Sequence, residues 1–400
     1  MQHTTLRFFH QIVLPIVALV PSLQAKHQSD YGYRKFFSQE HVLLSLYAHL
    51  SKAESVNDLA EQLADPKQLT SQLIGQPRPV NSSTISRANA NRSCQLWQDL
   101  FSQLYPTLNQ HFKRLHFGGL SELDQVRLVD GSLFEALSTM LWASYSTTKN
   151  KLKGHFFLDL NGLPDKLIVS AGKTSERQIL LQQIQPQITY VFDRGYNSYQ
   201  LFSQIQAKGA YFVSRLLDNA IFSVKENLRV FENDQKQGVT NDQIIILGQK
   251  TDHETATMLR LITYRSTKGE IYCYLTNRFD LSGLTIVRMY LWRWEIETFF
   301  GWLKRHLVFK HWYSENENGV RIQLFAGLIT YLLLRLYAAT KGQSRVRIYQ
   351  VRQVRHWLGL EISQAELLEY QAKLKQTLDL TYCETYCKPL IWLNDLWDFL

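Results

Sequence analysis

The chain has a helical pattern up to about residue 120 and strand-like runs from 125 to 285. This change of pattern limits the fold more than any other feature. Short runs of apolar and β-branched residues, separated by polar turns, predict a three-stranded meander at 125–130, 154–160 and 166–171. Segments with helical periodicity then alternate with strand-like runs: helices at 175–184 and 198–208, strands at 189–193 and 210–216. We therefore predict a mixed α/β core.

The 400 residues exceed what one compact core usually needs, so several structural units are expected. Strand-like runs between charged turns continue beyond the core, and helical periodicity marks both ends of the chain. The predicted division is a helical N-terminal domain at 1–120, the first part of the core at 121–216, a β-rich inserted subdomain at 217–285, the final helices of the core at 286–340, and a helical C-terminal region at 341–400.

The charge balance favours a polyanionic partner. The chain has 44 Lys and Arg residues against 35 Asp and Glu, a net charge of +9. Such an excess suits nucleic acid or an acidic membrane surface. A merely basic protein explains the charge equally well.

Four cysteines, at 94, 273, 383 and 387, show no two-residue spacing of the kind that zinc ribbons and redox motifs use. We interpret all four as reduced thiols of a cytoplasmic protein.

Two apolar stretches raise the question of a membrane. Residues 12–20 are apolar and follow Arg7, but Pro15 interrupts them, so a short packed helix fits better than a secretion signal. Residues 324–337 are too few to span a bilayer and include Arg335, which indicates a buried core helix. No membrane-spanning segment and no membrane partner are predicted.

A predicted helix in the N-terminal domain begins near Ser82 and carries Arg87, Asn89 and Arg92. Arginine and asparagine form bidentate hydrogen bonds with guanine and adenine edges, so this helix is a candidate for DNA recognition. A solvated polar helix is an equally good interpretation.

The strongest local feature is the segment 290–306, which we predict to lie within one long helix from about 286 past 305. On such a helix Tyr290, Arg293, Glu297 and Lys304 share a stripe about 60° wide. A carboxylate with cationic and hydroxyl donors on one face suits a phosphodiester site, because it offers a metal ligand and phosphate contacts.

An ordinary ion pair between Arg293 and Glu297 on a solvated helix is the alternative interpretation. The aromatic side chains around the stripe argue against solvation, since they indicate a largely buried helix: Trp292, Trp294, Phe299, Phe300 and Trp302. Buried charges need partners or metal ions.

Two aspartates supply further ligands. Asp130 and Asp193 each end a strand-like run, and a glycine follows at 131 and 195. Ligands collect at strand ends in open α/β sheets, and a tight glycine turn would expose the carboxylate oxygens. Together with Glu297 they offer hard oxygen ligands for two Mg²⁺ ions, the arrangement used for in-line displacement at phosphorus.

These segments resemble the DDE transposases of the IS-four family of bacterial insertion sequences. The family signature is Tyr, two residues, Arg, three residues, Glu, six residues, Lys, and this chain matches it at all four positions. The resemblance extends to residues 83–89, 130–132, 149–155 and 193–196, and covers most of the chain from about 30 to 340.

The resemblance implies an RNase H-like, retroviral-integrase-like core with a β-rich insertion, a helical N-terminal domain that binds transposon ends, and a nucleoid-associated protein. It implies that Asp130, Asp193 and Glu297 are catalytic and bind Mg²⁺, which Mn²⁺ can replace. Contacts with double-stranded DNA are implied for Tyr290, Arg293, Trp294, Lys304 and Arg194. A homodimer that pairs two terminal inverted repeats with target DNA is also implied, with the C-terminal helices as candidates for its assembly.

One departure concerns hairpin formation, for which relatives use a tryptophan of the insertion. This chain has no tryptophan between 193 and 291, so Tyr264, Tyr272 or Tyr274 would have to stack a base instead. The expected reaction is cleavage by metal-activated water followed by attack of the freed 3′-OH on target DNA. A nuclease that does not join DNA, and a catalytically silent DNA-binding protein derived from a transposase, remain alternatives.

Overall fold

The computed structural model describes residues 6–116, 125–146, 149–248, 258–343 and 345–378. The chain divides into two compact units. Unit 1 contains Met1–Gly118, Glu135–Trp142 and Trp302–Leu400, and unit 2 contains Gly119–Phe134 and Ala143–Gly301. The boundary between the two units falls after Gly301, within the predicted segment 286–340.

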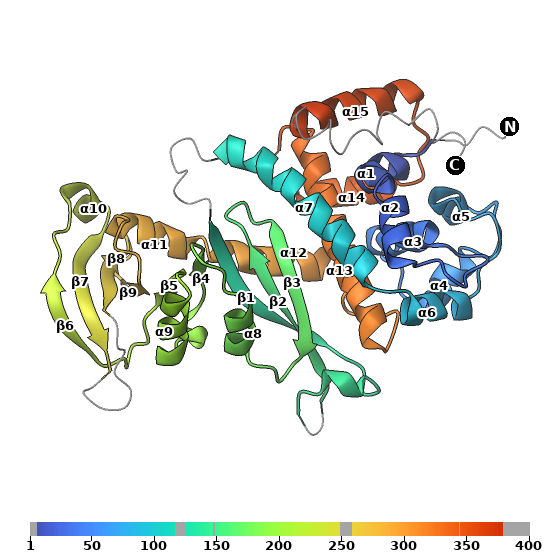
Figure 1. The fold of residues 1–400 in the computed structure, drawn as a ribbon. Helices are drawn as coiled ribbons and strands as arrows, with labels where there is room; N and C mark the ends of the chain where they lie inside the picture. Colours follow the sequence, from blue (N-terminus) through green and yellow to red (C-terminus); the bar gives the residue numbers. More distant parts are fainter. Residues whose placement is uncertain (1–5, 117–124, 147–148, 249–257, 344, 379–400) are drawn as a thin grey trace. The chain divides into compact units, whose positions relative to one another are not determined.

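Unit 2 is built on a nine-stranded sheet with the order β3-β2-β1-β4-β5-β9-β8-β7-β6 (Figure 1). The predicted mixed α/β class is correct. The strands are β1 (Val126–Glu135), β2 (Lys151–Leu158), β3 (Pro164–Ala171), β4 (Thr189–Val191), β5 (Tyr211–Arg215), β6 (Phe222–Asn227), β7 (Val239–Leu247), β8 (Leu259–Arg265) and β9 (Ile271–Thr276).

The centre of this sheet is parallel. β4 lies between β1 and β5 and pairs in parallel with both, whereas β2 and β3 pair in antiparallel fashion. Helix α8 (Glu176–Gln183) connects β3 to β4, and α9 (Tyr199–Ala207) connects β4 to β5. Their apolar faces contribute to the core through Leu180 and Phe202. Phe202 stacks on Phe212 of β5 with ring centroids 4.5 Å apart.

The predicted β-rich insertion extends this sheet. Strands β6 to β9 are antiparallel, and β9 pairs with β5. Asp242 and Arg260, both almost completely buried, form an ion pair of 2.6 Å between β7 and β8. The short α10 (Glu232–Lys236) lies between β6 and β7 in the sequence.

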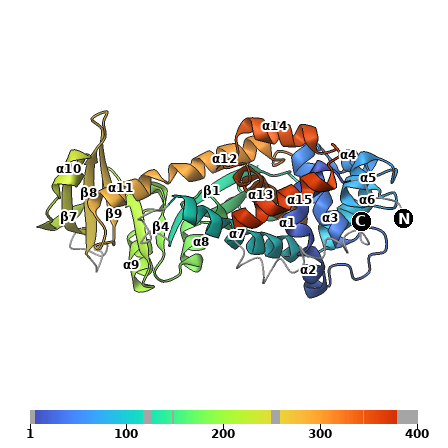
Figure 2. The same ribbon diagram turned by 90° about the horizontal axis from the view of Figure 1, so that it is seen from above.

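The predicted long helix is two helices. α11 (Gly283–Leu291) and α12 (Trp294–His306) follow one another (Figure 2), and a turn at Trp292 and Arg293 separates them. The amide of Glu295 donates to the carbonyl of Trp292, a tighter turn than an α-helix makes. Tyr290 therefore lies on a different helix from Glu297, and the single stripe is a wrong prediction.

Unit 1 is helical and centres on α13 (Glu317–Ala339), almost all of whose residues are buried. Around it lie α1 (Phe8–Val17), α2 (Val20–His27), α3 (Ser38–Ser51), α4 (Val56–Glu61), α5 (Leu69–Ile74), α6 (Ser82–Asn91), α7 (Gln95–His116), α14 (Ile348–Trp357) and α15 (Gln364–Leu378), together with the end of α12.

Two stretches of the described chain have the length and apolarity of a membrane span. One is α13, whose apolar window is completely buried within the protein, as predicted for residues 324–337. The other is the pair α1 and α2, which is bent by 50°. Both serve as packed helices here, since Phe9, Ile12, Ile16 and Val20 are buried.

Candidate active site

Asp130 lies on β1 of unit 2, and Asp193 lies just after the end of β4, the parallel neighbour of β1. The register pairs Leu128 of β1 with Val191 of β4. Each aspartate lies two residues beyond its member of that pair, Asp130 still within β1 and Asp193 two residues after the end of β4. The two carboxylates lie near one another, because the charge of Asp193 raises the pKa of Asp130.

The prediction that Asp130 ends a strand is wrong, because β1 continues to Glu135. Only its pairing with β4 ends before Asp130. Gly131 consequently makes no turn. Its missing side chain leaves room for Glu176 of α8, since a Cβ at Gly131 would lie 2.5 Å from the Glu176 carboxylate oxygen. Asp193 does follow its strand, and its Oδ1 accepts a hydrogen bond from the Gly195 amide.

The environment of Asp130 disfavours its charge. The pKa of Asp130 is raised to about 7, chiefly by burial and also by the charges of Asp193 and Glu176, against the lowering effects of the Gly131 amide and Arg293. A carboxyl group that titrates near neutral pH is typical of a functional site.

Arg293 links the aspartates to Glu297. It donates a hydrogen bond of 2.8 Å to Oε1 of Glu297. Burial alone would lower the pKa of Arg293, but this hydrogen bond and the charges of Glu297, Asp130 and Tyr290 raise it instead. Burial also raises the pKa of the Tyr290 phenol, with contributions from Arg293, which lowers it, and Asp193, which raises it. Three of the four signature residues therefore meet at one site despite the helix break.

Two charged residues at this site were not predicted. Glu176 is the first residue of α8, and its carboxylate lies 3.1 Å from the ammonium group of Lys153 on β2. An acidic residue in a first helical turn is common for reasons of helix stability alone, so the sequence contained no signal for this position. Lys153 lies within the family-like segment 149–155, but nothing assigned it a role.

The chemistry of the donors fits a divalent cation. Four carboxylates, of Asp130, Asp193, Glu176 and Glu297, gather here, with Arg293 and Lys153 as cationic partners of some of them. The buried hydroxyl of Tyr196 has no hydrogen-bond partner among the described residues, and burial together with Glu176, Asp130 and Asp193 raises its pKa well above the usual value. Within the described chain, however, no three His, Cys, Asp or Glu side chains converge closely enough to hold a metal ion as they stand.

The raised pKa of Asp130 predicts a pH-dependent cost to stability. The folded state holds this proton up to about pH 7, whereas an unfolded aspartate loses it near pH 4, so stability falls as the pH rises between these values. Asp130→Asn should therefore stabilise the protein in EDTA at pH 8, by up to about 4 kcal/mol, and change little near pH 4. Urea unfolding of both proteins at the two pH values checks this, and equal stabilities at pH 8 would contradict it.

A row of tyrosines connects the inserted strands to this site. Tyr274 of β9 is buried, with its ring centroid 4.9 Å from that of Tyr290. Tyr272 stacks near Tyr274 at 6.3 Å and is partly exposed, with the guanidinium of Arg215 4.9 Å from its ring centre. Tyr264 also lies beside Tyr274. Of these three, Tyr272 and Tyr264 have accessible surface.

The remaining predicted DNA contacts around the signature are exposed. Trp294 is 60% exposed at the start of α12. Lys304 is exposed two turns after Glu297 on the same helix. Arg194 follows Asp193 and forms an ion pair of 3.2 Å with Asp218, itself highly exposed.

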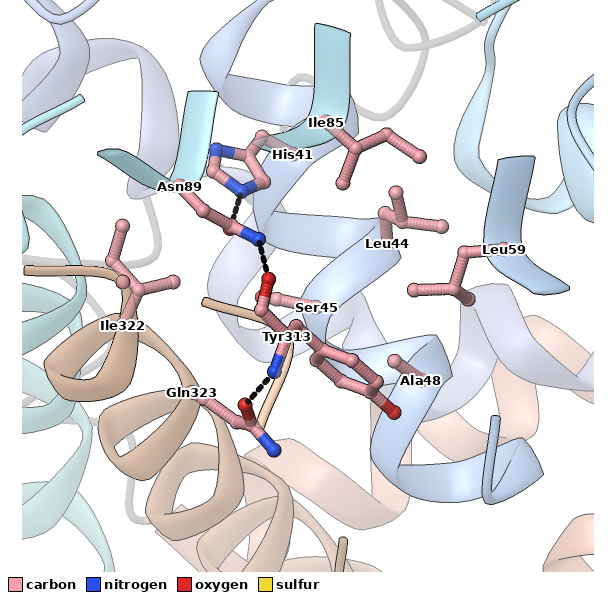
Figure 3. Close-up of a pocket in the computed structure, with 11 residues that line it drawn as sticks. His41, Leu44, Ser45, Ala48, Leu59, Ile85, Asn89, Tyr313, Ile322 and Gln323 are labelled. Atoms are coloured by element: carbon pink, nitrogen blue, oxygen red, sulfur yellow. Dashed lines mark hydrogen bonds between the residues drawn. The ribbon is translucent and has the colours of Figure 1, made fainter. Parts of the chain in front are cut away.

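The structure corrects two of the three predicted DNA contacts on α6. Arg92, 1% exposed, donates hydrogen bonds to the carbonyls of Ser29 and Phe36 and forms an ion pair with Asp30. Asn89, 7% exposed, bonds to His41 and the carbonyl of Tyr313, beside a cavity of about 20 Å³ (Figure 3). Both side chains are thus used inside unit 1. Arg87 remains exposed.

Comparison with known families gives two matches. The family described as Transposase DDE domain matches residues 121–333, more than half of the chain. A domain of unknown function, DUF4372, matches residues 6–72.

Similar proteins are transposases. A putative transposase, y4zB, of Sinorhizobium fredii is 29% identical over 269 residues, covering 66% of this chain and 74% of that protein. A probable transposase for insertion sequence element IS5377 of Geobacillus stearothermophilus is 28% identical, covering 72% and 75%. Among solved structures, a piggyBac transposase synaptic complex with hairpin DNA matches with a TM-score of 0.43 and 11% identity, covering 98% of this chain and 87% of that one. That likeness is too weak to identify a fold or an activity.

Proposed function

Because this chain belongs to the family of DDE transposases, we propose that it binds the ends of an insertion sequence, cuts the DNA there and joins the freed 3′ ends to target DNA. The observation that supports this most is the neighbouring pair Asp130 and Asp193, with the Arg293–Glu297 ion pair linked to it. Transposases bind DNA, and DDE domains generally use divalent metal ions, which suits this acidic site.

In this proposal Asp130, Asp193 and Glu297 hold two Mg²⁺ ions, which Mn²⁺ can replace. Once bound, the ions activate water and stabilise the charge on the attacking and leaving oxygens. Glu297 must turn away from Arg293 to complete the set, and its 45% exposed side chain has the room to do so. Arg293 is then free to donate to a phosphate oxygen, for which its planar guanidinium is well suited.

The other signature residues hold the DNA end. The Tyr290 hydroxyl, Lys304 and the exposed ring of Trp294 contact phosphates and terminal nucleotides, and Arg194 and Arg87 add phosphate or base contacts. Tyr272 is the best-placed aromatic side chain of the insertion for stacking a base, because it is accessible and belongs to the row that reaches Tyr290.

Three further assignments belong to this proposal. The complete match of the Tyr, Arg, Glu and Lys signature supports membership of the IS-four family. The parallel centre of the sheet, preceded by an antiparallel meander, supports an RNase H-like core. The proposal also includes a homodimer, because cutting two element ends together would use one acidic site from each of two subunits.

The test is excision of the element from a supercoiled plasmid that carries the protein's own transposon ends. With Mg²⁺ we expect release of the element and joining to target DNA, and with EDTA neither product. Metal-dependent cleavage without joined products would show a nuclease instead. Tight binding to the ends without cleavage would show a silent DNA-binding protein.

A further inference from the structure

Three helices of unit 1 meet at the end of α12. Arg355 of α14 joins them, because its Nε donates to the carbonyl of Leu50 at 2.8 Å and its terminal nitrogen donates to the carbonyl of His306. Leu50 lies in the last turn of α3, and His306 is the last residue of α12. Helix C-termini leave carbonyls unpaired and slightly negative, so one guanidinium satisfies both ends.

Cationic side chains surround this junction. Lys52 is the C-cap of α3, Arg305 is in the last turn of α12, Lys310 follows that helix, and Arg352 lies one turn before Arg355 on the same face of α14. Lys52, Arg305, Lys310 and Arg352 are exposed, and Arg355 is half-buried. We call these five residues the basic patch.

Like charges in the patch act on one another. Partial burial lowers the pKa of Lys52, and the charges of Arg355, Lys310 and Arg352 lower it further. Burial likewise lowers the pKa of His306, with Arg355, Arg305, Lys52 and Arg352 adding to the effect. Lys52, Lys310 and Arg352 have no ion pair with an acidic side chain in the described part of the chain.

The backbone conformation of Lys52 also indicates that this lysine serves binding rather than the fold. Its φ of 61° lies in the left-handed region that favours glycine, which is the usual residue at such a helix end. A lysine at this position adds repulsion and some backbone strain, and the fold gains no partner for it. A surface that keeps like charges together is suited to a polyanion.

We propose that the basic patch binds the phosphate backbone of duplex DNA without reading its sequence. The patch offers charged donors and no acceptor, and phosphate oxygens are acceptors, whereas base edges present both. This inference rests on the proposed function, since it takes DNA as the polymer on which the protein acts. The patch belongs to unit 1 and contains no residue of the acidic site of unit 2, so it adds affinity rather than chemistry.

The test compares the full-length double variant Lys52→Glu/Arg352→Glu with wild type in binding to two labelled duplexes, one with the transposon end and one of unrelated sequence. We expect the affinity for both duplexes to fall by the same factor, about tenfold or more. The slope of log affinity against log salt should fall by about two, because each lost phosphate contact removes about 0.9. Arg34→Glu/Lys35→Glu is the matched control, since both residues are exposed in unit 1 outside the patch, and it should leave affinity and slope near wild type.

A second variant, Lys52→Gly/Arg352→Ala, removes both charges, and glycine suits the left-handed backbone at position 52. This variant should also bind both duplexes more weakly than the wild type does. If both patch variants bind DNA as the wild type does, and the wild type cleaves DNA, the patch proposal is overturned and the proposed function stands. The same conclusion follows if the variants lose binding only to vesicles of anionic lipid and keep their binding to DNA. Loss confined to the transposon end would overturn backbone binding. A wild-type protein that neither binds nor cleaves DNA would overturn the proposed function as well.

Discussion

Glu297→Gln is expected to reduce DNA cleavage by about 10³-fold or more while leaving binding to transposon ends intact. A metal site supplies several kcal/mol to the transition state, and each 1.4 kcal/mol corresponds to a factor of ten in rate. The amide keeps the shape of the side chain but removes the charge that now pairs with Arg293 at 2.8 Å. Single-turnover cleavage and anisotropy binding measure the two effects separately.

Glu295→Gln is the matched control, because it removes the same charge two residues earlier on α12. It should cleave at nearly the wild-type rate. If Glu297→Gln also cleaves normally, Glu297 is not a ligand and the Arg293–Glu297 pair is an ordinary helix ion pair. If both variants lose activity together, the loss reflects the helix rather than the position.

Arg92→Met is expected to destabilise the protein by about 3–5 kcal/mol. The guanidinium is nearly inaccessible and contacts Asp30, His41 and two backbone carbonyls at once. Its removal therefore leaves several buried polar groups without this hydrogen-bond partner. Arg92→Lys should rescue little, because one ammonium cannot reproduce this fork of contacts. Urea unfolding monitored by circular dichroism gives the free-energy change.

Arg87→Ala, on the same helix, should show the opposite behaviour. Its side chain is exposed, so stability should change by no more than about 0.5 kcal/mol, while affinity for transposon ends falls. An Arg92→Met protein with wild-type stability but weakened DNA binding would restore Arg92 as a DNA contact.

The periodicity of the sequence predicts most elements of unit 2, because strands and helices alternate there with clear turns. The sequence also predicts that Asp130 and Asp193 lie close together, since both follow apolar runs that form neighbouring parallel strands. The break at Trp292 and Arg293 could not be predicted, because neither residue opposes helix formation. The site still assembles, because Arg293 contacts Glu297 from the turn between the two helices.

The sequence also could not predict which polar side chains at α6 are buried. Polar residues at 87, 89 and 92 look alike along the chain, yet only the packing around α6 decides which of them faces inward. Glu176 illustrates the converse case, because its role depends on the close approach that Gly131 permits. Both examples concern contacts between segments far apart in the sequence, which local patterns do not encode.

The central claim is that Asp130, Asp193 and Glu297 together hold the catalytic metal ions. Its most direct test is a crystal structure of the protein with bound DNA ends and Mn²⁺, with the metal located by anomalous scattering. The prediction is anomalous density between Asp130 and Asp193, with Glu297 turned from Arg293 towards it. Density held by other side chains, or Mn²⁺ bound with Glu297 still paired to Arg293, would contradict the claim.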